Sequence, residues 1–351
     1  MEVIIFIVGL ASLILIHEIG HFVAARLANI EVEEFGIGFP PRIIKLFSLH
    51  GTDYTLNWIP LGGFVRPKGE NDPDVEGGLG AASPWARLFV LSAGSFMNLL
   101  VGIVIYSLIF IRIGQPIFDQ VVVLEVSAGS PALEAGLMVD DHILQVNENV
   151  IDGQDALTAS IQSNLDQPIS ILLDREGEEI LLEAVPSSQR TPQEGSLGIL
   201  MGNPTQPIPF TQAFVFGADA VYRNMLAILA LPGRLLSGDA QPQEGRIVGY
   251  KGMVDILGVM QERDEEAPAA LAGINTLSFF GAITVSLGLL NLFPLPALDG
   301  GRILFVLPEL IFGKRVPAQY ENTIHLVGFA FWMIILVYVN LQDFINPVFQ
   351  P

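Results

Sequence analysis

Two histidines four residues apart, with a glutamate beside the first, are the residues of this chain whose types and spacing predict chemistry: His17-Glu18-Ile-Gly-His21. On a helix, residues i and i+4 share one face, so both imidazoles can bind one metal ion. Glu18 then lies beside the ion, where its carboxylate can take a proton from water. The pattern predicts a metal-dependent hydrolytic site with His17 and His21 as ligands and Glu18 as the base. A soluble core helix and a chance match are the alternatives.

The composition predicts a multi-pass α-helical membrane protein. Of the 351 residues, 51% are hydrophobic and only 15% are charged, and the mean hydropathy is +0.51. Such values are too apolar for an average soluble protein. The chain has no cysteine, so a metal must use His, Asp or Glu. The formal net charge of -20 disfavours nucleic acid as a partner.

About four membrane-spanning helices are expected, at residues 2–27, 88–111, 274–293 and 324–341. The segment from Arg26 to Arg87 is rich in basic residues and therefore predicts the cytoplasmic side, whereas the acidic stretch 114–270 predicts the outside. The N-terminus would then lie outside, with the histidine motif toward the cytoplasm. Residues 207–237 are amphipathic but interrupted by Asp219, Arg223 and Arg234, which favours an interfacial helix over a span.

Within the basic segment, residues 54–65 alternate and are rich in β-formers, with Pro60 and Gly62-Gly63 as an expected turn. They predict a membrane-associated β-hairpin. It is either a small surface sheet or an edge strand that pairs with an extended substrate. Residues 69–83 are expected to form a flexible acidic loop.

Residues 118–190 predict a compact α+β module. Strands are expected at 121–124, 168–174 and 179–185, with a helix near 155–165. The run Gly129-Ser-Pro-Ala-Leu-Glu-Ala-Gly-Leu137 followed by Asp141-His-Ile-Leu-Gln-Val-Asn147 resembles a PDZ domain. This resemblance implies binding of a C-terminus or an extended segment by strand addition. Four regions are therefore expected: a membrane half at 1–113, a PDZ domain at 114–190, an amphipathic linker at 191–272 and a second membrane half at 273–351.

The third metal ligand is expected to be Asp299. A hydrolytic zinc site usually has three protein ligands and one position for water. Asp299 follows Pro294 and Pro296 in an apolar segment, where an unpaired carboxylate is costly. Glu33 and Glu34 are the alternatives. Asn98, in the second predicted span, either binds a neighbouring helix or faces the metal site.

Together these features resemble the site-2 protease family of intramembrane zinc metalloproteases, in the bacterial branch with an inserted PDZ domain. The resemblance rests on His17-Glu18-x-x-His21, the stretch from Asn291 to Gly301 and the PDZ insert. It implies one Zn²⁺ held by His17, His21 and Asp299, with Asn291 near the site. Asn98 and Asn291 are the candidates for substrate or oxyanion binding. The resemblance also implies transmembrane substrates, such as anti-sigma factors or signal-peptide remnants, and a place in the bacterial cell membrane. The alternative is a membrane scaffold that binds through its PDZ domain and uses the metal structurally.

Overall fold

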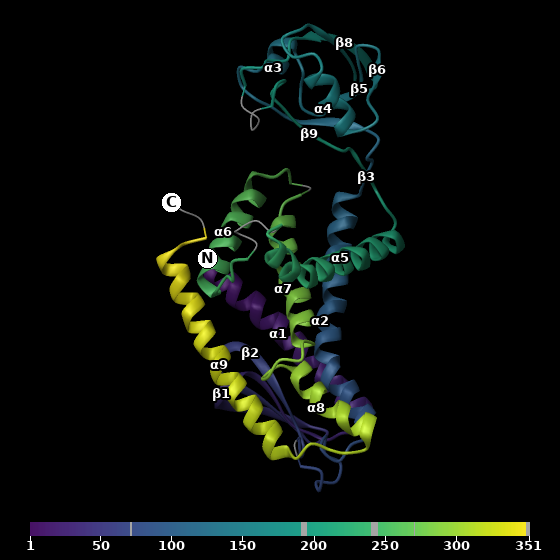
Figure 1. Cartoon of the computed structure of the whole chain (residues 1–351). Coiled ribbons are helices and arrows are strands. Elements are labelled where there is room, and N and C mark those ends of the chain that lie inside the picture. Colours follow the sequence, from purple (N-terminus) through teal and green to yellow (C-terminus); the bar gives the residue numbers. More distant parts are fainter. Residues whose placement is uncertain (71, 191–194, 240–244, 270, 349–351) are drawn as a thin grey trace. The chain divides into compact units, whose positions relative to one another are not determined.

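The computed structural model describes residues 1–348 except 71, 191–194, 240–244 and 270, and of residue 61 it describes only the backbone. The chain forms two compact units (Figure 1). The membrane unit comprises Met1–Arg112 and Phe210–Pro351, and the insert unit comprises Ile113–Pro209. Each unit is described by itself.

Within the described part of the chain, five helices are long and apolar enough to cross a bilayer. They are α1 (Glu2–Leu27), α2 (Pro84–Ile113), α5 (Phe210–Ser237), α7 (Ile274–Asn291) and α9 (Ala318–Ile345). The four predicted spans correspond to α1, α2, α7 and α9. Helix α5 is the segment that was expected to be interfacial, and Figure 1 shows it lying across α2 rather than alongside it. Its place relative to the bilayer stays a prediction.

Two shorter helices were not predicted from the sequence. Helix α6 (Tyr250–Glu266) lies in the acidic region expected to be linker, and α8 (Asp299–Phe312) lies between the third and fourth predicted spans. Helix α6 is stabilised by tertiary contacts, because Leu257 is fully buried in a cluster with Phe6 and Leu10 of α1. Such burial depends on partners far away in the sequence and is invisible to local composition.

The predicted hairpin at 54–65 is part of a larger β-structure. Strand β1 (Val32–Leu49) pairs with β2 (Thr52–Pro67), with a tight turn at His50-Gly51. The first part of β1 pairs with β2 on both sides: Gly36 lies opposite Phe64 and also opposite Thr55. The chain therefore reverses direction between Leu56 and Gly63, where Pro60 and Gly62-Gly63 were expected to form the turn, and Gly62 has φ +116°. The two arms of the predicted hairpin do not pair with each other, because β1 lies between them.

The segment expected to be a flexible acidic loop, residues 69–83, is held by specific contacts. Leu79 is buried, and its N–H donates to the carbonyl of Lys68 at 2.9 Å. The N–H of Gly80 donates to Gly69 at the same distance. Glu70 forms an ion pair with Arg302 of α8. The segment is a loop, as predicted, but its acidic composition gives no indication of a partner that lies more than 200 residues away.

The insert unit is a small α+β module. Its main sheet has the order β8-β7-β5-β4-β9, with β6 paired to β5. The strands are β4 (Val121–Val126), β5 (His142–Val146), β6 (Asn149–Val150), β7 (Ile169–Arg175), β8 (Glu178–Ala184) and β9 (Ile199–Gly202); β3 (Gln115–Pro116) and β10 (Thr205–Gln206) form a separate pair. The unit extends beyond the predicted end at residue 190 because β9 pairs with β4.

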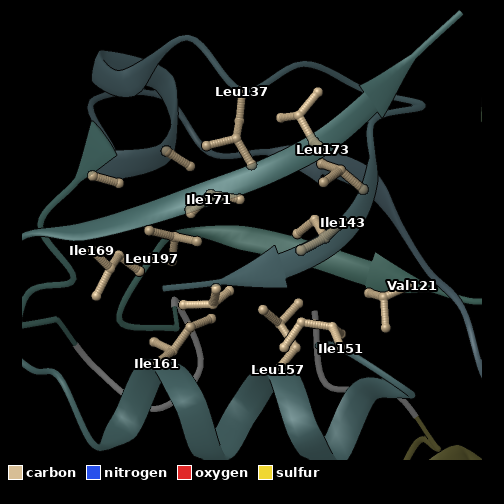
Figure 2. Packing of buried hydrophobic residues seen from close by; sticks show 14 residues of the cluster. Val121, Leu137, Ile143, Ile151, Leu157, Ile161, Ile169, Ile171, Leu173 and Leu197 are labelled. Carbon is tan, nitrogen blue, oxygen red and sulfur yellow. The ribbon is translucent and has the colours of Figure 1, made fainter. Parts of the chain in front are cut away.

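Two helices complete the insert unit, α3 (Pro131–Ala135) and α4 (Gln154–Gln162). The Ser-Pro signal starts α3 as expected, since the Ser130 hydroxyl accepts a hydrogen bond from the Leu133 N–H at 3.1 Å. Figure 2 shows Leu157 and Ile161 of α4 pointing toward sheet residues that include Ile143 and Ile171. The unit therefore has a hydrophobic core of its own.

Candidate metal and active site

Helix α1 presents His17, Glu18 and His21 from an otherwise apolar sequence. The two imidazoles lie one turn apart on one face, as the spacing predicts. Their Nε2 atoms are 3.0 Å apart. His17 is buried, with 7% of its surface exposed. The polar groups are therefore enclosed by the membrane unit.

Asp299 is brought to these histidines by the break between α7 and α8. Residues 292–298 connect the two helices without regular structure, and Asp299 is the first residue of α8. Its Oδ2 lies 3.0 Å from His17 Nε2 and 3.2 Å from His21 Nε2. Among the described residues, these three form the only group of His and acidic side chains that could hold a metal ion.

Helix α2 shapes the space around the imidazoles. A Cβ atom at Gly94 would lie 2.4 Å from His21 Nε2 and 2.7 Å from His17 Nε2, so only glycine leaves room for both rings. One turn earlier, the carbonyl of Val90 accepts a hydrogen bond from His21 Nδ1–H at 2.8 Å. This bond places the proton on Nδ1 of a neutral His21. The lone pair of His21 Nε2 then faces His17 and Asp299.

The donor set fits zinc. Two imidazole nitrogens and one carboxylate oxygen form a common zinc ligand set. Ligands about 2.0 Å from a tetrahedral ion are about 3.3 Å apart, and the three observed separations are 3.0, 3.0 and 3.2 Å. Lone pairs that converge this closely repel one another unless a cation or a proton lies between them.

A cavity of about 340 Å³ adjoins this group. Glu18, His21 and Asp299 line it, together with Gly63-Phe64-Val65 of β2 and Arg302 of α8. The N–H of Val65 donates to Glu18 Oε2 at 3.0 Å, which orients the carboxylate. Strand β2 therefore holds Glu18 beside the cavity. The opposite edge of residues 63–66 pairs with β1.

Four other residues considered from the sequence are not at this cavity. Asn98 is fully buried, and its backbone carbonyl accepts a hydrogen bond from the Thr284 hydroxyl of α7 at 3.1 Å. Its side-chain amide has no hydrogen-bond partner among the described residues and does not line the cavity, so its candidacy for substrate or oxyanion binding stays a prediction. Asn291 ends α7 half-buried and is also absent from the lining. Glu34 is buried in ion pairs with Arg42 and Arg66, and Glu33 is exposed on β1.

Several residues that shape the site were not predicted from the sequence. Gly94 and Val90 act through an absent side chain and a backbone carbonyl, which leave no pattern in a single sequence. Arg302 and Glu70 are more than 200 positions apart in the sequence, yet Arg302 lines the cavity and forms an ion pair with Glu70. The one available signal was Arg302 itself, a lone cation three residues after Asp299 in an apolar stretch.

Curated proteins similar to this chain are named as zinc metalloproteases. One from Clostridium perfringens is 32% identical over 99% of this chain and 100% of its own length. Another, from Helicobacter pylori, is 30% identical over 98% of both chains. The zinc metalloprotease RasP of Oceanobacillus iheyensis is 25% identical over 97% of this chain and 98% of its own length.

Among solved structures, a PDZ domain of an SdrC-like protein from Listeria monocytogenes covers 24% of this chain and 88% of its own. The identity is 18% and the TM-score is 0.21, which is a slight likeness.

The model of peptidase family M50 matches residues 5–335, nearly the whole chain. The match includes the histidine motif of α1, the segment around Asp299 and the insert unit between them. Together with the apolar helices, it establishes a membrane metallopeptidase. The chain belongs to peptidase family M50, the site-2 protease family.

Proposed function

We propose that this protein is an intramembrane zinc peptidase that hydrolyses peptide bonds within or near the transmembrane segment of membrane-protein substrates. The observation that carries the proposal is the convergence of His17, His21 and Asp299 beside a cavity that Glu18 lines. The histidines and Glu18 lie in a helix long and apolar enough to span a bilayer. A hydrolytic site in that place serves substrates that are themselves in the membrane.

One Zn²⁺ ion would be held by His17, His21 and Asp299. When bound, it supplies a Lewis acid that makes water more acidic and a peptide carbonyl more electrophilic. Residues of α2 that are not themselves ligands orient the imidazoles. Val90 fixes the tautomer of His21, and Gly94 leaves space for both rings.

Glu18 is the proposed general base and acid. Its carboxylate accepts a proton from the water that attacks the substrate carbonyl carbon, and it returns that proton to the leaving amine. The carbon–oxygen bond forms as the carbon–nitrogen bond breaks, so water is consumed and two chain ends are produced. The Val65 N–H, 3.0 Å from Glu18 Oε2, holds the carboxylate for both transfers.

Strand β2 is the proposed platform for the substrate. A transmembrane helix shields its own peptide bonds, so it must unwind locally before a carbonyl can be attacked. Extended substrate would lose its helical hydrogen bonds, and an edge strand can replace them. Residues 63–65 line the cavity beside Glu18 and pair with β1 only along their other edge. This supports pairing of the substrate with that edge.

The insert unit is the proposed binding module for a substrate C-terminus or an extended segment. Among the described residues, β9 pairs with β4 alone and is therefore an edge strand of its sheet. It follows Gly198, which has φ +78° and leads the chain into the strand. An edge strand of this kind can receive a further strand. We also propose the bacterial cell membrane as the location, with the insert unit outside and the metal site toward the cytoplasm.

The test is the zinc content of the purified full-length chain in detergent, together with cleavage of a single-span reporter in proteoliposomes. His17→Ala, His21→Ala and Asp299→Ala should each lose zinc and cleavage. His142→Ala, in β5 of the insert unit, is the matched control and should keep both. If Asp299→Ala binds zinc as tightly as the unaltered protein, the ligand assignment is wrong. If zinc binds normally but no membrane substrate is cut, a scaffold with a structural metal is favoured.

A further inference from the structure

A β-turn lies directly before Asp299. Residues Leu295–Leu298 form it, and the Leu298 N–H donates to the Leu295 carbonyl at 3.3 Å. Its second residue is Pro296 and its third, Ala297, has φ +73°. This is the pattern of a type II turn, whose third position normally holds glycine or asparagine. Alanine in this left-handed conformation is strained, because its Cβ approaches the following carbonyl.

Helix α9 contacts both ends of the central peptide group of this turn. The indole Nε1–H of Trp332 donates to the Pro296 carbonyl at 3.1 Å. The Ala297 N–H donates to His325 Nδ1 at 2.9 Å. The carbonyl and N–H of one trans peptide group point in opposite directions. Two bonds to opposite ends of the group therefore fix the orientation of its plane.

The sequence of α9 is suited to this contact. His325, Gly328 and Trp332 have the spacing i, i+3 and i+7, which places them on one helix face. Gly328 is buried, and a Cβ there would lie 2.2 Å from the Cβ of Pro296. Leu326 and Phe329, on other faces, are more than half exposed. Close approach at Gly328 lets the two side chains reach the turn from either side.

We propose that His325 and Trp332 are positioning residues that hold the turn before Asp299 in its strained type II form. Types I and II differ by a flip of the central peptide group. The flip would relieve Ala297 of its positive φ, and it would break both hydrogen bonds to α9. Asp299 lies two residues after Ala297, so the conformation of the turn determines the position of its carboxylate relative to His17 and His21. The inference rests on the proposed role of Asp299 as a zinc ligand.

The test measures how fast the full-length protein, loaded with one zinc ion in detergent, loses zinc to an excess of EDTA. His325→Ala and Trp332→Phe each remove one of the two hydrogen bonds. We expect zinc loss about 10- to 100-fold faster, the usual effect of removing a group that orients a metal ligand. Leu326→Ala and Phe329→Leu are the matched controls in α9 and should lose zinc at the unaltered rate.

A second substitution separates the turn mechanism from simple packing. Glycine takes φ +73° without strain. Ala297→Gly should therefore restore slow zinc loss, at least in part, when combined with His325→Ala or Trp332→Phe. A packing defect in α9 would not be repaired by a change in the turn. If one of the single variants does not fold, the other and its Ala297→Gly partner carry the test.

The outcomes are distinguishable. Fast zinc loss from Asp299→Ala with normal retention in His325→Ala and Trp332→Phe would overturn the inference alone. Fast loss in these two variants that Ala297→Gly does not slow would overturn the turn mechanism. Normal retention in Asp299→Ala would instead contradict the proposed function, because Asp299 would then not be a ligand.

Discussion

At the scale of single residues, the metal site depends on the missing side chain at Gly94 of α2 as much as on the histidines of α1. His17 and His21 occupy space that a Cβ at position 94 would fill, and Val90 orients His21 by a backbone carbonyl. The helices can approach so closely because Gly20 of α1 faces Ala93 of α2, where a Cβ would meet the Ala93 carbonyl at 2.5 Å. One methyl group is therefore enough to disturb the ligands.

Gly94→Ala is expected to abolish high-affinity zinc binding while the chain still folds. The added methyl group would displace both imidazoles, and ligand geometry tolerates only about 0.2 Å of change. The measurement is zinc per chain after gel filtration in detergent. Gly102→Ala, two turns along α2, places its methyl group against Val285 of α7, away from both imidazoles, and should keep its zinc. Equal zinc in both variants would contradict this description of the site.

The ligands could be predicted at this scale because charged or polar residues in apolar segments are costly without a role. That reasoning selected His17, His21 and Asp299, which the structure brings together. It did not select His325, which looked isolated in the sequence. Its contact with Ala297 depends on how α9 packs against a turn 28 residues away. Packing of that kind has no local pattern.

At the scale of elements, α6 is fixed to α9 by one buried carboxylate. Asp343 of α9 is fully buried and accepts hydrogen bonds from the N–H groups of Gly249 and Gly252, at 2.7 and 3.0 Å. It also pairs with Arg246 at 3.2 Å. The side chain thus satisfies free N–H groups at the start of α6, which its own helix cannot satisfy.

Asp343→Ala is expected to destabilise the start of α6 by about 1–3 kcal/mol, because it leaves buried N–H groups without a partner. Hydrogen exchange of the amides at 249–253 should then be about 5- to 150-fold faster, at about 1.4 kcal/mol for each factor of ten. Gln342→Ala is the control, since Gln342 bonds to Asn346 within α9. Unchanged exchange in Asp343→Ala would show that α6 is held by its apolar contacts alone.

An element could be predicted where its own residues determine its structure, and not where distant contacts do. The spans α1, α2, α7 and α9 were predicted because a long uncharged run is decided by its own composition. The reversal of β2 around Pro60 and Gly62-Gly63 was predicted from local turn residues, whereas the place of β1 between the two arms was not, because β1 lies outside the predicted hairpin. Helix α8 was missed because it is short and contains Pro308.

At the scale of the whole molecule, the site is assembled from both ends of the chain. His17 and Asp299 are separated by 282 positions, and the insert unit lies between them in the sequence. The basic residues of segment 26–87 and the acidity of residues 114–270 predict opposite sides of the membrane for these two regions. The metal site and the insert unit would then face different compartments.

The absence of cysteine from the chain makes this orientation directly testable. Ala81→Cys and Glu148→Cys place single thiols at exposed positions in segment 26–87 and in the insert unit. A membrane-impermeant maleimide added to intact cells should label Glu148→Cys and leave Ala81→Cys unlabelled. Inverted vesicles should give the reverse pattern. Labelling of both thiols from one side would contradict the proposed orientation.

The central claim is that Glu18 performs proton transfer in peptide hydrolysis at a zinc site within the membrane. The most direct measurement is the cleavage rate of a single-span reporter in proteoliposomes by Glu18→Gln, at a zinc content matched to the unaltered protein. Loss of a general base should lower the rate by about 10²- to 10⁴-fold without removing zinc. Glu33→Gln, on the exposed face of β1, should cleave at the unaltered rate. Undiminished cleavage by zinc-loaded Glu18→Gln would contradict the account.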